Sequence, residues 1–515
     1  MLEKFKNEPL IDFTKQENID KMEEAFKKLD VEKGKEYPLI IGGEKIYTDE
    51  KITSYNPCNF KEIIGIVSKG NEELADKSMC SALEAFEMWK NVCPKERANY
   101  LFKAAAIMRR KKFDFSALLV EEAGKTWIEA DADVAEAIDF LEYYGRQMLK
   151  FAKGMDVGSF PGEINECYYI PMGVGIVIAP WNFPLAILTG MTAASIVTGN
   201  TVVIKPSSST PVVAAKFMEI WDEIKLPDGV INYLPGPGES VGNYLVSHPK
   251  TRFINFTGSK DVGLNISKMA SDIKDGQKCI KRVIAEMGGK DTIIVDNEAD
   301  LDAAAEGIVA SAFGFQGQKC SACSRAIIVE DIYDEMIDKI VEKTKKLKIG
   351  PTRKFDTNFG AVIDENAYEK ILTYIEIGRN EGKICFGGNK CGESGYFIEP
   401  TIIVDVSPDA RISQEEIFGP VLSVIKVDNF DCALNIANDT DYGLTGAVYS
   451  NNRQKLEKAK REFHVGNLYL NRKCTGALVG VQPFGGFKLS GTCSKAGGED
   501  YLLLFMEIKS VAERL

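Results

Sequence analysis

The chain of 515 residues has only two histidines, His248 and His464. Two histidines offer few ligands or bases for a histidine-based catalytic dyad or a zinc site. We therefore expect carboxylates to carry out acid–base catalysis, and we expect no metal. The sequence also lacks an apolar run long enough to cross a bilayer, and its first twenty residues lack the apolar core of a secretion signal. We therefore expect a cytoplasmic protein without a membrane partner.

The basic residues form no cluster. The chain has 63 Lys and Arg against 75 Asp and Glu, a formal net charge of −12, without long blocks of one sign. Nucleic acids and anionic membranes are bound by clustered Lys and Arg, so neither is the expected partner. The twelve cysteines are scattered through a long chain, whereas disulfide frameworks are typical of small secreted ones. We expect most of these thiols to be reduced and structural.

The hydrophobic pattern divides the chain. Residues 75–151 are helical in pattern, and from Gly173 short β-branched runs alternate with helices. Such alternation predicts a parallel sheet with helical crossovers. A second α/β series starts near Asp291, so the boundary between two α/β domains falls near 288–289. An apolar stretch at 502–512 is expected to be a strand that pairs with another segment or another subunit.

The stretch FGFQGQKCSACSR contains Cys320 and Cys323 between helix-like residues and a strand. A zinc site would need a second ligand pair, and a thioredoxin-like pair would open a helix. Buried core is a further alternative, because free cysteine is often buried. A nucleophile suits the context better, since Gly317 and small neighbours leave Cys320 room to meet a substrate.

Three further segments carry polar groups where strands end. In AEMGGKD, Glu286 precedes a glycine pair and is either a functional or a surface carboxylate. In APWNFPLAI, Asn182 either donates to a developing negative charge or satisfies a turn. In FTGSKDVG, Gly258 and Ser259 either open a phosphate-binding helix or merely cap it.

In this order, the segments resemble the NAD(P)-dependent aldehyde dehydrogenase superfamily. The matching segments are PWNFP, IKPSSSTP, FTGS, EMGGK, GQKCSACSR, EEIFGPV and PFGGFKLSG, and the resemblance runs from about Tyr37 to the C-terminus. It implies an α/β fold with a Rossmann-type cofactor domain, an α/β catalytic domain and a small β oligomerisation flap. The implied parts are an arm and helices (1–155), an oligomerisation strand (156–172), an NAD-binding domain (173–288), a catalytic domain (289–484) and a tail with a second oligomerisation strand (485–515).

The resemblance also implies roles for single residues. Cys320 takes the place of the nucleophile, Glu286 of the general base and Asn182 of the oxyanion donor, while Cys323 is a bystander. The expected cofactor is NAD, and the positions implied to bind it are Pro180, Trp181, Lys205, Ser208, Gly258, Ser259, Gly288, Glu416 and Phe418. Ser208 stands where many relatives carry Glu, which leaves NADP possible.

Within the family, the chain resembles the branch that oxidises L-glutamate γ-semialdehyde to glutamate in proline degradation. The segments that carry this likeness are the helix DADVAEAIDFLEYY, the stretch NRKCTGALVGVQPFGGFKLSGT and the tail KAGGEDYLLLF. The implied substrate contacts are Ser321, Gly476 and Ala477 for the α-carboxylate, Glu136 for the ammonium, and Phe183 and Phe484 for the aliphatic chain. A small zwitterion needs such an anion cradle, an anionic partner and a narrow apolar waist.

The expected partners are few. The substrate is a small molecule, the terminal strand suggests a homodimer or higher homo-oligomer, and a functional link to a separate proline dehydrogenase is possible. Two alternatives stay open: a dehydrogenase for another small aldehyde, and a non-catalytic thiol-redox scaffold.

Overall fold

The first half of the chain is built around a seven-stranded sheet of order β11-β10-β7-β8-β9-β2-β3 in the computed structural model, which describes residues 3–515. Strands β7 to β11 pair in parallel, and β2 and β3 add antiparallel pairs at one edge. The strands are β2 (Leu39–Ile41), β3 (Glu44–Ile46), β7 (Val174–Ile178), β8 (Thr201–Lys205), β9 (Ile231–Tyr233), β10 (Thr251–Thr257) and β11 (Arg282–Glu286). The predicted β–α alternation after Gly173 is confirmed.

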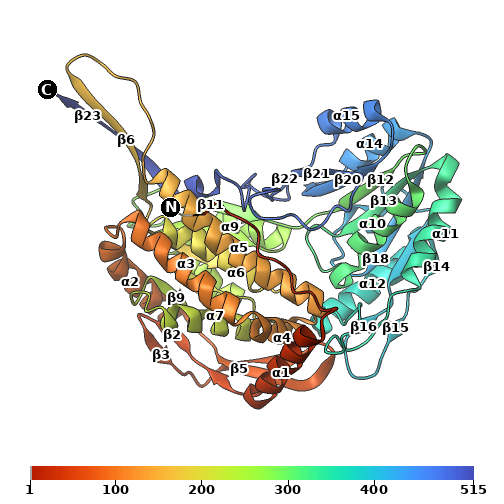
Figure 1. Cartoon of the computed structure of the whole chain (residues 1–515), viewed down its shortest axis with the longest axis horizontal. Coiled ribbons are helices and arrows are strands. Elements are labelled where there is room, and N and C mark those ends of the chain that lie inside the picture. Colours follow the sequence, from red (N-terminus) through yellow and green to blue (C-terminus); the bar gives the residue numbers. More distant parts are fainter. Residues whose placement is uncertain (1–2) are drawn as a thin grey trace.

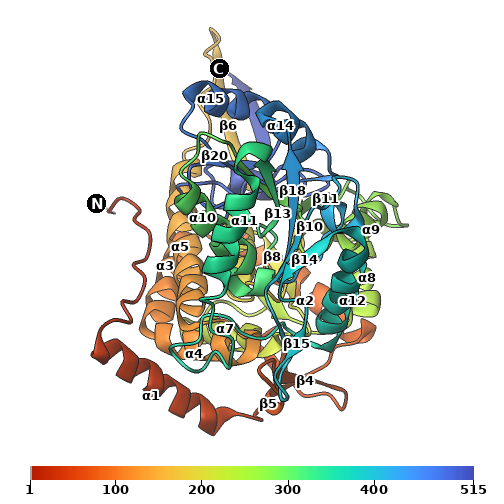
Figure 2. The ribbon, with the colours of Figure 1, turned by 90° about the vertical axis from the view of Figure 1, so that its right-hand side faces the viewer.

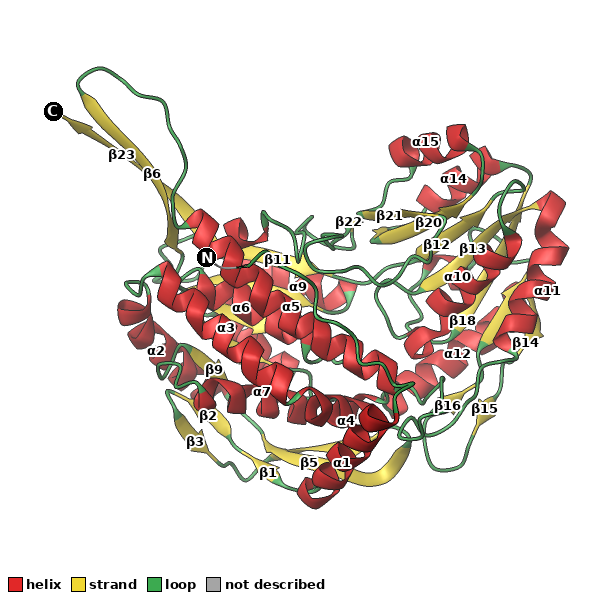
Figure 3. Ribbon diagram, viewed as in Figure 1, coloured by secondary structure: helices red, strands yellow, loops and turns green. Residues whose placement is uncertain are grey.

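Helices cover this sheet, as Figure 3 shows. They are α1 (Gln16–Glu32), α2 (Glu72–Trp89), α3 (Pro94–Arg110), α4 (Lys112–Ala123), α5 (Trp127–Phe151), α6 (Ala186–Val197), α7 (Pro211–Glu223), α8 (Asn243–Ser247) and α9 (Lys260–Ser271), with a π-helical turn η1 (Gly238–Gly242) before α8. Helix α5 begins at a capping box formed by Thr126 and Glu129. It packs against α3 and α6, and its face of Val134, Ile138, Leu141 and Met148 is buried.

The second half contains another seven-stranded sheet, of order β14-β17-β18-β13-β12-β20-β21. Its strands are β12 (Asp291–Val295), β13 (Cys323–Val329), β14 (Lys383–Phe386), β17 (Thr401–Val404), β18 (Val421–Val427), β20 (Thr445–Tyr449) and β21 (Asn467–Leu470). All pairs except β14–β17 are parallel. The helices are α10 (Leu301–Phe313), α11 (Tyr333–Thr344), α12 (Glu365–Glu381), α13 (Arg411–Gln414), α14 (Phe430–Asn438) and α15 (Arg453–Glu462), with short 3-10 turns η2 (Gly314–Gly317) and η3 (Glu330–Ile332).

Smaller β elements complete the fold. They are β1 (Glu36–Tyr37), β4 (Lys51–Asn56) and β5 (Asn59–Ser68) in one sheet, and the pairs β15 (Lys390–Cys391) with β16 (Phe397–Ile398), β19 (Tyr442–Gly443) with β22 (Phe487–Lys488), and β6 (Glu163–Pro171) with β23 (Met506–Arg514). The ribbon of β6 and β23 projects from the body in Figure 1. The expected strand at 502–512 is partly wrong, because 501–505 form a 3-10 turn, η4 (Tyr501–Phe505), which packs against α6 and α5 with Leu502 and Phe505 buried and the Phe505 ring on Phe253 of β10.

The N-terminal arm, residues 3–15, runs along α5 before the chain enters α1, and Figures 1 and 2 show it lying over the outer side of the helical layer. Within residues 3–515, no helix is long and apolar enough to cross a membrane.

Candidate active site

The predicted site residues of the first half follow neighbouring parallel strands. Asn182 lies four residues after β7, Lys205 ends β8, Gly258 follows β10 at once and Glu286 ends β11. Because these strands are parallel and adjacent in the sheet, their carboxyl ends lie along one edge. Gly258 N–H donates to the Glu286 carbonyl at 3.1 Å, which joins two of the four positions directly.

The segment between α10 and β13 turns sharply before it reaches Cys320. Phe315, Gln316 and Gly317 all have φ between 52° and 67°, a left-handed run that costs energy at the two non-glycine residues. A Cβ at Gly317 would lie 2.3 Å from the Gly419 carbonyl oxygen, so only glycine fits there. The tight turn places Cys320 in the loop just before β13.

Cys320 and Glu286 meet across the two halves of the chain. The Cys320 Sγ donates to Glu286 Oε1 at 3.7 Å. Both residues keep part of their surface open, but protein surrounds their functional groups. Burial raises the pKa of Glu286 to about 7, and the thiol's hydrogen bond only partly offsets that rise. Burial, reinforced by the nearby carboxylate of Glu286, raises the pKa of the Cys320 thiol well above its usual value. The thiol is therefore protonated and has a carboxylate beside it.

Asn182 faces the same loop. Its side chain is 4% exposed, its Nδ2 donates to the Gln318 carbonyl at 3.2 Å, and its Oδ1 accepts from Phe183 N–H at 3.1 Å. The second bond fixes the amide so that its NH₂ group points toward the segment that carries Cys320. A buried amide with one N–H aimed at this loop can stabilise negative charge that develops beside the sulfur.

The residues predicted for the cofactor leave unsatisfied groups. Lys205 is buried, burial lowers its pKa to about 8, and its Nζ makes one hydrogen bond within residues 3–515, to the Pro206 carbonyl at 3.2 Å. Ser259 is the N-cap of α9, but its hydroxyl makes no capping bond within the described chain. A buried ammonium and a free helix N-terminus fit ribose hydroxyls and phosphates respectively.

The other predicted cofactor positions come from both halves of the chain. Glu416 Oε1 accepts from Gly289 N–H at 3.0 Å, and a Cβ at Gly288 would lie 2.2 Å from its Oε2. The rings of Trp181 and Phe418 meet edge to face at 5.4 Å. Ser208 is exposed in the loop after β8 and Pro180 is partly exposed after β7, and no described contact joins either to the other positions.

The predicted substrate residues come from three places. Glu136 lies on α5, and burial, with the nearby Asp133 carboxylate, raises its pKa to about 8. Ser321 follows Cys320, and its carbonyl accepts from the Cys474 thiol at 3.4 Å, which ties it to the loop of Gly476 and Ala477. Phe484 pairs with Ala496 through two backbone bonds.

The second cysteine of the segment FGFQGQKCSACSR is buried. Cys323 is 1% exposed at the start of β13, and its thiol donates to the Arg325 carbonyl at 3.4 Å. Across residues 3–515, no group of three or more His, Cys, Asp and Glu is placed to hold a metal ion. All twelve cysteines are unpaired.

Comparison with known proteins decides the family. The model of the aldehyde dehydrogenase family matches residues 46–511. The chain belongs to this family. It is 62% identical over 513 residues to a 1-pyrroline-5-carboxylate dehydrogenase of Geobacillus sp. (strain WCH70), with all of both chains covered.

Solved structures agree. A 1-pyrroline-5-carboxylate dehydrogenase from Thermus with bound NAD is 52% identical to the chain, with a TM-score of 0.99 and all of both chains covered. Proline utilization A (PutA) from Bdellovibrio bacteriovorus is 46% identical, with a TM-score of 0.98 over 99% of this chain and 53% of that one. The family fold expected from the sequence, with its use of NAD, is confirmed.

Sequence reasoning missed a buried cation in this aldehyde dehydrogenase. Lys125 is 1% exposed, and its Nζ lies 3.7 Å from the ring centroid of Phe183 and 4.5 Å from that of Phe315. The same Nζ pairs with Asp133 at 3.1 Å, and Asp133 accepts from Ala186 N–H at the start of α6. Lys125 follows a turn glycine outside the matched motifs, so the sequence offered no signal for it.

Proposed function

We propose that this aldehyde dehydrogenase oxidises L-glutamate γ-semialdehyde, the open form of 1-pyrroline-5-carboxylate, to L-glutamate with NAD in proline degradation. The single observation that carries the chemistry is the contact of the Cys320 thiol with the Glu286 carboxylate, 3.7 Å apart. The substrate is supported by relatives named 1-pyrroline-5-carboxylate dehydrogenase that match the whole chain at 58–62% identity.

The cofactor would be held mainly by the first half of the chain, within the domain limits expected from the sequence, and Glu416 and Phe418 of the second half would complete its site. Lys205 and Glu416 would hold its riboses, and the backbone N–H groups after Ser259 would hold phosphate. Trp181 and Phe418 would line its nicotinamide end. NAD, when bound, accepts the hydride that the aldehyde carbon gives up.

Cys320 attacks the aldehyde carbon. Glu286 accepts the thiol proton, and the sulfur bonds to the carbonyl carbon to form a thiohemiacetal. Asn182 Nδ2 and the Cys320 backbone N–H donate to its oxyanion. After oxidation, Cys320 carries a thioester. Glu286, having lost its proton to solvent, then takes a proton from water, whose oxygen displaces the Cys320 sulfur and releases glutamate.

Asn182→Ala is expected to lower kcat by about 10²–10³-fold, because it removes one oxyanion donor. NAD binding, followed by fluorescence quenching, should stay near the wild-type value because the amide does not hold the cofactor. The matched control is Asn91→Ala, because the Asn91 amide donates only to the Glu87 carbonyl on the surface. Asn200→Ala would not serve, because the Asn200 side chain bonds buried backbone groups. A normal rate in Asn182→Ala would remove Asn182 from the mechanism.

The substrate's zwitterionic end meets Ser321, Gly476 and Ala477 through its carboxylate and Glu136 through its ammonium. With a pKa of about 8, Glu136 is largely protonated in the free protein at pH 7. An ammonium placed against it favours the ionised form, so substrate binding releases a proton there. Phe183 and Phe484 line the aliphatic chain of the substrate. The Lys125 ammonium lies over the Phe183 ring and helps to hold it in place.

The initial rate of NAD reduction tests the substrate. We expect the rate with glutamate γ-semialdehyde to exceed that with a plain aliphatic aldehyde of the same length by about 10²-fold or more. This is roughly the effect of two contacts to charged groups, which only the zwitterion can make. Glu136→Ala should lose about tenfold of that preference, whereas Glu142→Ala, which removes partly exposed ion pairs of the same helix with Arg109 and Arg146, should keep it.

Equal turnover of both aldehydes would keep the chemistry but assign another small aldehyde as substrate. No turnover of either, with a Cys320–Cys323 disulfide forming instead, would support the thiol-redox scaffold.

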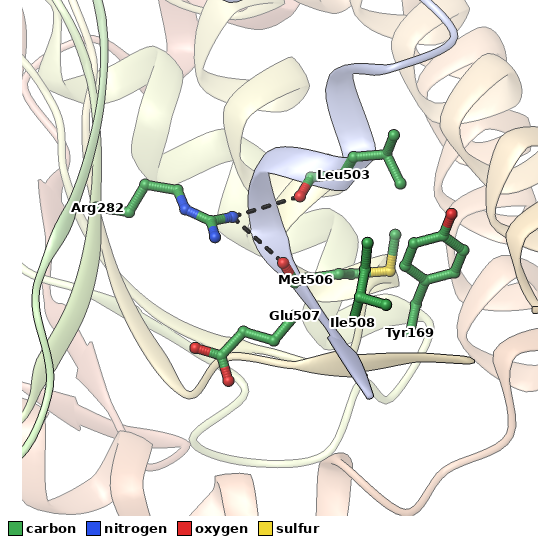
Figure 4. Close-up of a pocket in the computed structure, with 6 residues that line it drawn as sticks. All are labelled: Tyr169, Arg282, Leu503, Met506, Glu507 and Ile508. Atoms are coloured by element: carbon green, nitrogen blue, oxygen red, sulfur yellow. Dashed lines mark hydrogen bonds between the residues drawn. The ribbon is translucent and has the colours of Figure 1, made fainter. Parts of the chain in front are cut away.

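We also propose at least a homodimer in which the β6–β23 ribbon packs on a partner. A two-stranded ribbon is marginal alone, and this one exposes Ile164 and Ile508. A cavity of about 280 Å³ lies at its base. Figure 4 shows residues that line it, among them Arg282, which donates to the Leu503 and Met506 carbonyls. None of its lining residues is a predicted site residue. A clean monomer by light scattering at micromolar concentration would contradict the dimer.

The surroundings of the protein follow from the same reasoning. The twelve unpaired cysteines support a reducing, cytoplasmic location, which cell fractionation tests. Because the chain matches 53% of a protein named for proline utilization, a separate proline dehydrogenase is the expected source of substrate. NADH formation from proline in a mixture of the two enzymes tests this link.

A further inference from the structure

The N-terminal arm joins the two elements that carry opposite ends of the predicted substrate site. Asn7 lies at the junction, and its Nδ2 donates to Asp139 Oδ2 at 2.8 Å and to the Val479 carbonyl at 3.0 Å. Asp139 follows Glu136 by one turn of α5, and Val479 lies in the loop that begins with Gly476. One side chain therefore connects the ammonium side of the site with the carboxylate side.

The arm is itself firmly attached to α5. Asp139 Oδ1 accepts from Glu8 N–H at 2.6 Å, and Asp131 Oδ2 accepts from Ile11 N–H at 2.7 Å. Lys112 pairs with Asp131 at 3.0 Å and donates to the Pro9 carbonyl at 2.7 Å. Both aspartates are buried, and their bonds to backbone N–H groups fix the position of the arm along the helix.

The arm and α5 also pack against this loop through two aromatic side chains. The rings of Phe5 and Tyr143 meet edge to face at 5.1 Å. Gly480 has φ of +75°, and a Cβ there would lie 3.0 Å from Tyr143 and 3.1 Å from Phe5. The backbone of the loop therefore fits closely against one arm residue and one α5 residue.

The loop has little else to hold its outer side. Leu478 and Val481 are 50% and 55% exposed, and Gly476 is exposed, while the Val479 side chain is buried. Gly480 N–H donates to the Gly497 carbonyl at 2.9 Å, and Arg472 donates to the Gly476 carbonyl at 3.2 Å. Leu478 N–H also donates to Gln482 Oε1 at 3.0 Å. These bonds hold the loop to its own ends and to the C-terminal segment, whereas Asn7 ties it to α5.

We propose that Asn7 is a positioning residue that holds the loop of Gly476 and Ala477 at its working distance from Glu136, and so determines selectivity for aldehydes that carry an α-amino acid group. Asn7 does not touch the reacting atoms. The inference rests on the proposed function, because it assigns the loop to the substrate carboxylate.

The test compares two aldehydes in two variants and a control. Asn7→Ala removes the donor, and Asn7→Asp removes it in a nearly isosteric side chain. Asn18→Ala is the matched control, since the Asn18 amide, in the first turn of α1, donates to the Asp12 carbonyl of the arm at 2.9 Å and reaches neither α5 nor the loop. Both Asn7 variants should raise KM for glutamate γ-semialdehyde about tenfold, equivalent to about 1.4 kcal/mol. Turnover of the plain aldehyde, KM for NAD and the Asn18→Ala enzyme should change by less than about twofold.

Binding of L-glutamate to the protein provides a readout apart from turnover. By calorimetry, the Asn7 variants should bind it about tenfold more weakly than wild type, as the KM effect requires. Equal losses of activity toward both aldehydes in the Asn7 variants would show that Asn7 only stabilises the fold. Unchanged selectivity would show that Asn7 has no role in substrate choice. Either result overturns the inference. Wild-type protein without a preference for the zwitterion would overturn the proposed function, and the inference with it.

Discussion

Cys320→Ala is expected to lower kcat roughly 10⁶-fold, the scale of loss when a catalytic nucleophile is removed. Without the sulfur, the aldehyde has no atom to which it can bond, and neither Asn182 nor Glu286 can replace it. The measurement is steady-state NAD reduction with glutamate γ-semialdehyde, beside a titration of NAD binding, which should stay normal because Cys320 does not hold the cofactor.

Cys323→Ala is the matched control. Cys323 lies three residues away and is buried at the start of β13, with its thiol bonded to a backbone carbonyl. We expect this variant to be less stable, because a small cavity replaces the sulfur, but to retain kcat within about an order of magnitude. Residual activity in Cys320→Ala together with loss in Cys323→Ala would exchange the two roles.

Glu286→Gln is expected to lower kcat about 10²–10⁴-fold, the usual contribution of a general base. Glutamine keeps the size of the side chain but cannot accept a proton from the thiol or from water. If hydrolysis of the thioester is the step most affected, rapid mixing should show a burst of NADH close to one per site, followed by slow turnover.

The pH profile tests the same residue independently. The Glu286 pKa of about 7 is raised above its usual value by burial, so the carboxylate is ionised above pH 7 and protonated below it. A base must be ionised to work, hence kcat at saturating substrate, where the substrate ammonium already keeps Glu136 ionised, should fall tenfold per pH unit below about 7. The fall should vanish in Glu286→Gln. A wild-type profile that is flat from pH 6 to 8 would contradict the assignment.

The sequence predicted most of the local structure because hydrophobic periodicity and turn-forming residues act over short distances along the chain. The runs VGIVI and TVVIK became β7 and β8, and the helical face of Val134, Ile138, Leu141 and Met148 is buried. The strand predicted from the LLLF run was wrong over residues 502–505. These residues are apolar because η4 is buried against α6 and α5, and apolar character alone does not show that the backbone is extended.

The contacts within the site were less predictable from composition and spacing. Glu286 and Cys320 lie 34 residues apart, one at the end of a strand of the first sheet and the other in the loop before a strand of the second, and only the resemblance to a family linked them. Asn7 and Val479 lie 472 residues apart, and Lys125 meets Phe183 through folding alone. Such pairs follow from the packing of α5 and the arm, which no local pattern encodes. The assigned roles of the site residues stay predictions until the variants are measured.

The central claim is that Cys320 carries a glutamyl thioester whose hydrolysis needs Glu286. Glu286→Gln, mixed with NAD and glutamate γ-semialdehyde and quenched in acid, should show by intact mass spectrometry an added glutamyl group, located by peptide mapping on Cys320. NADH formation without an adduct, or an adduct on Cys323, would contradict the account.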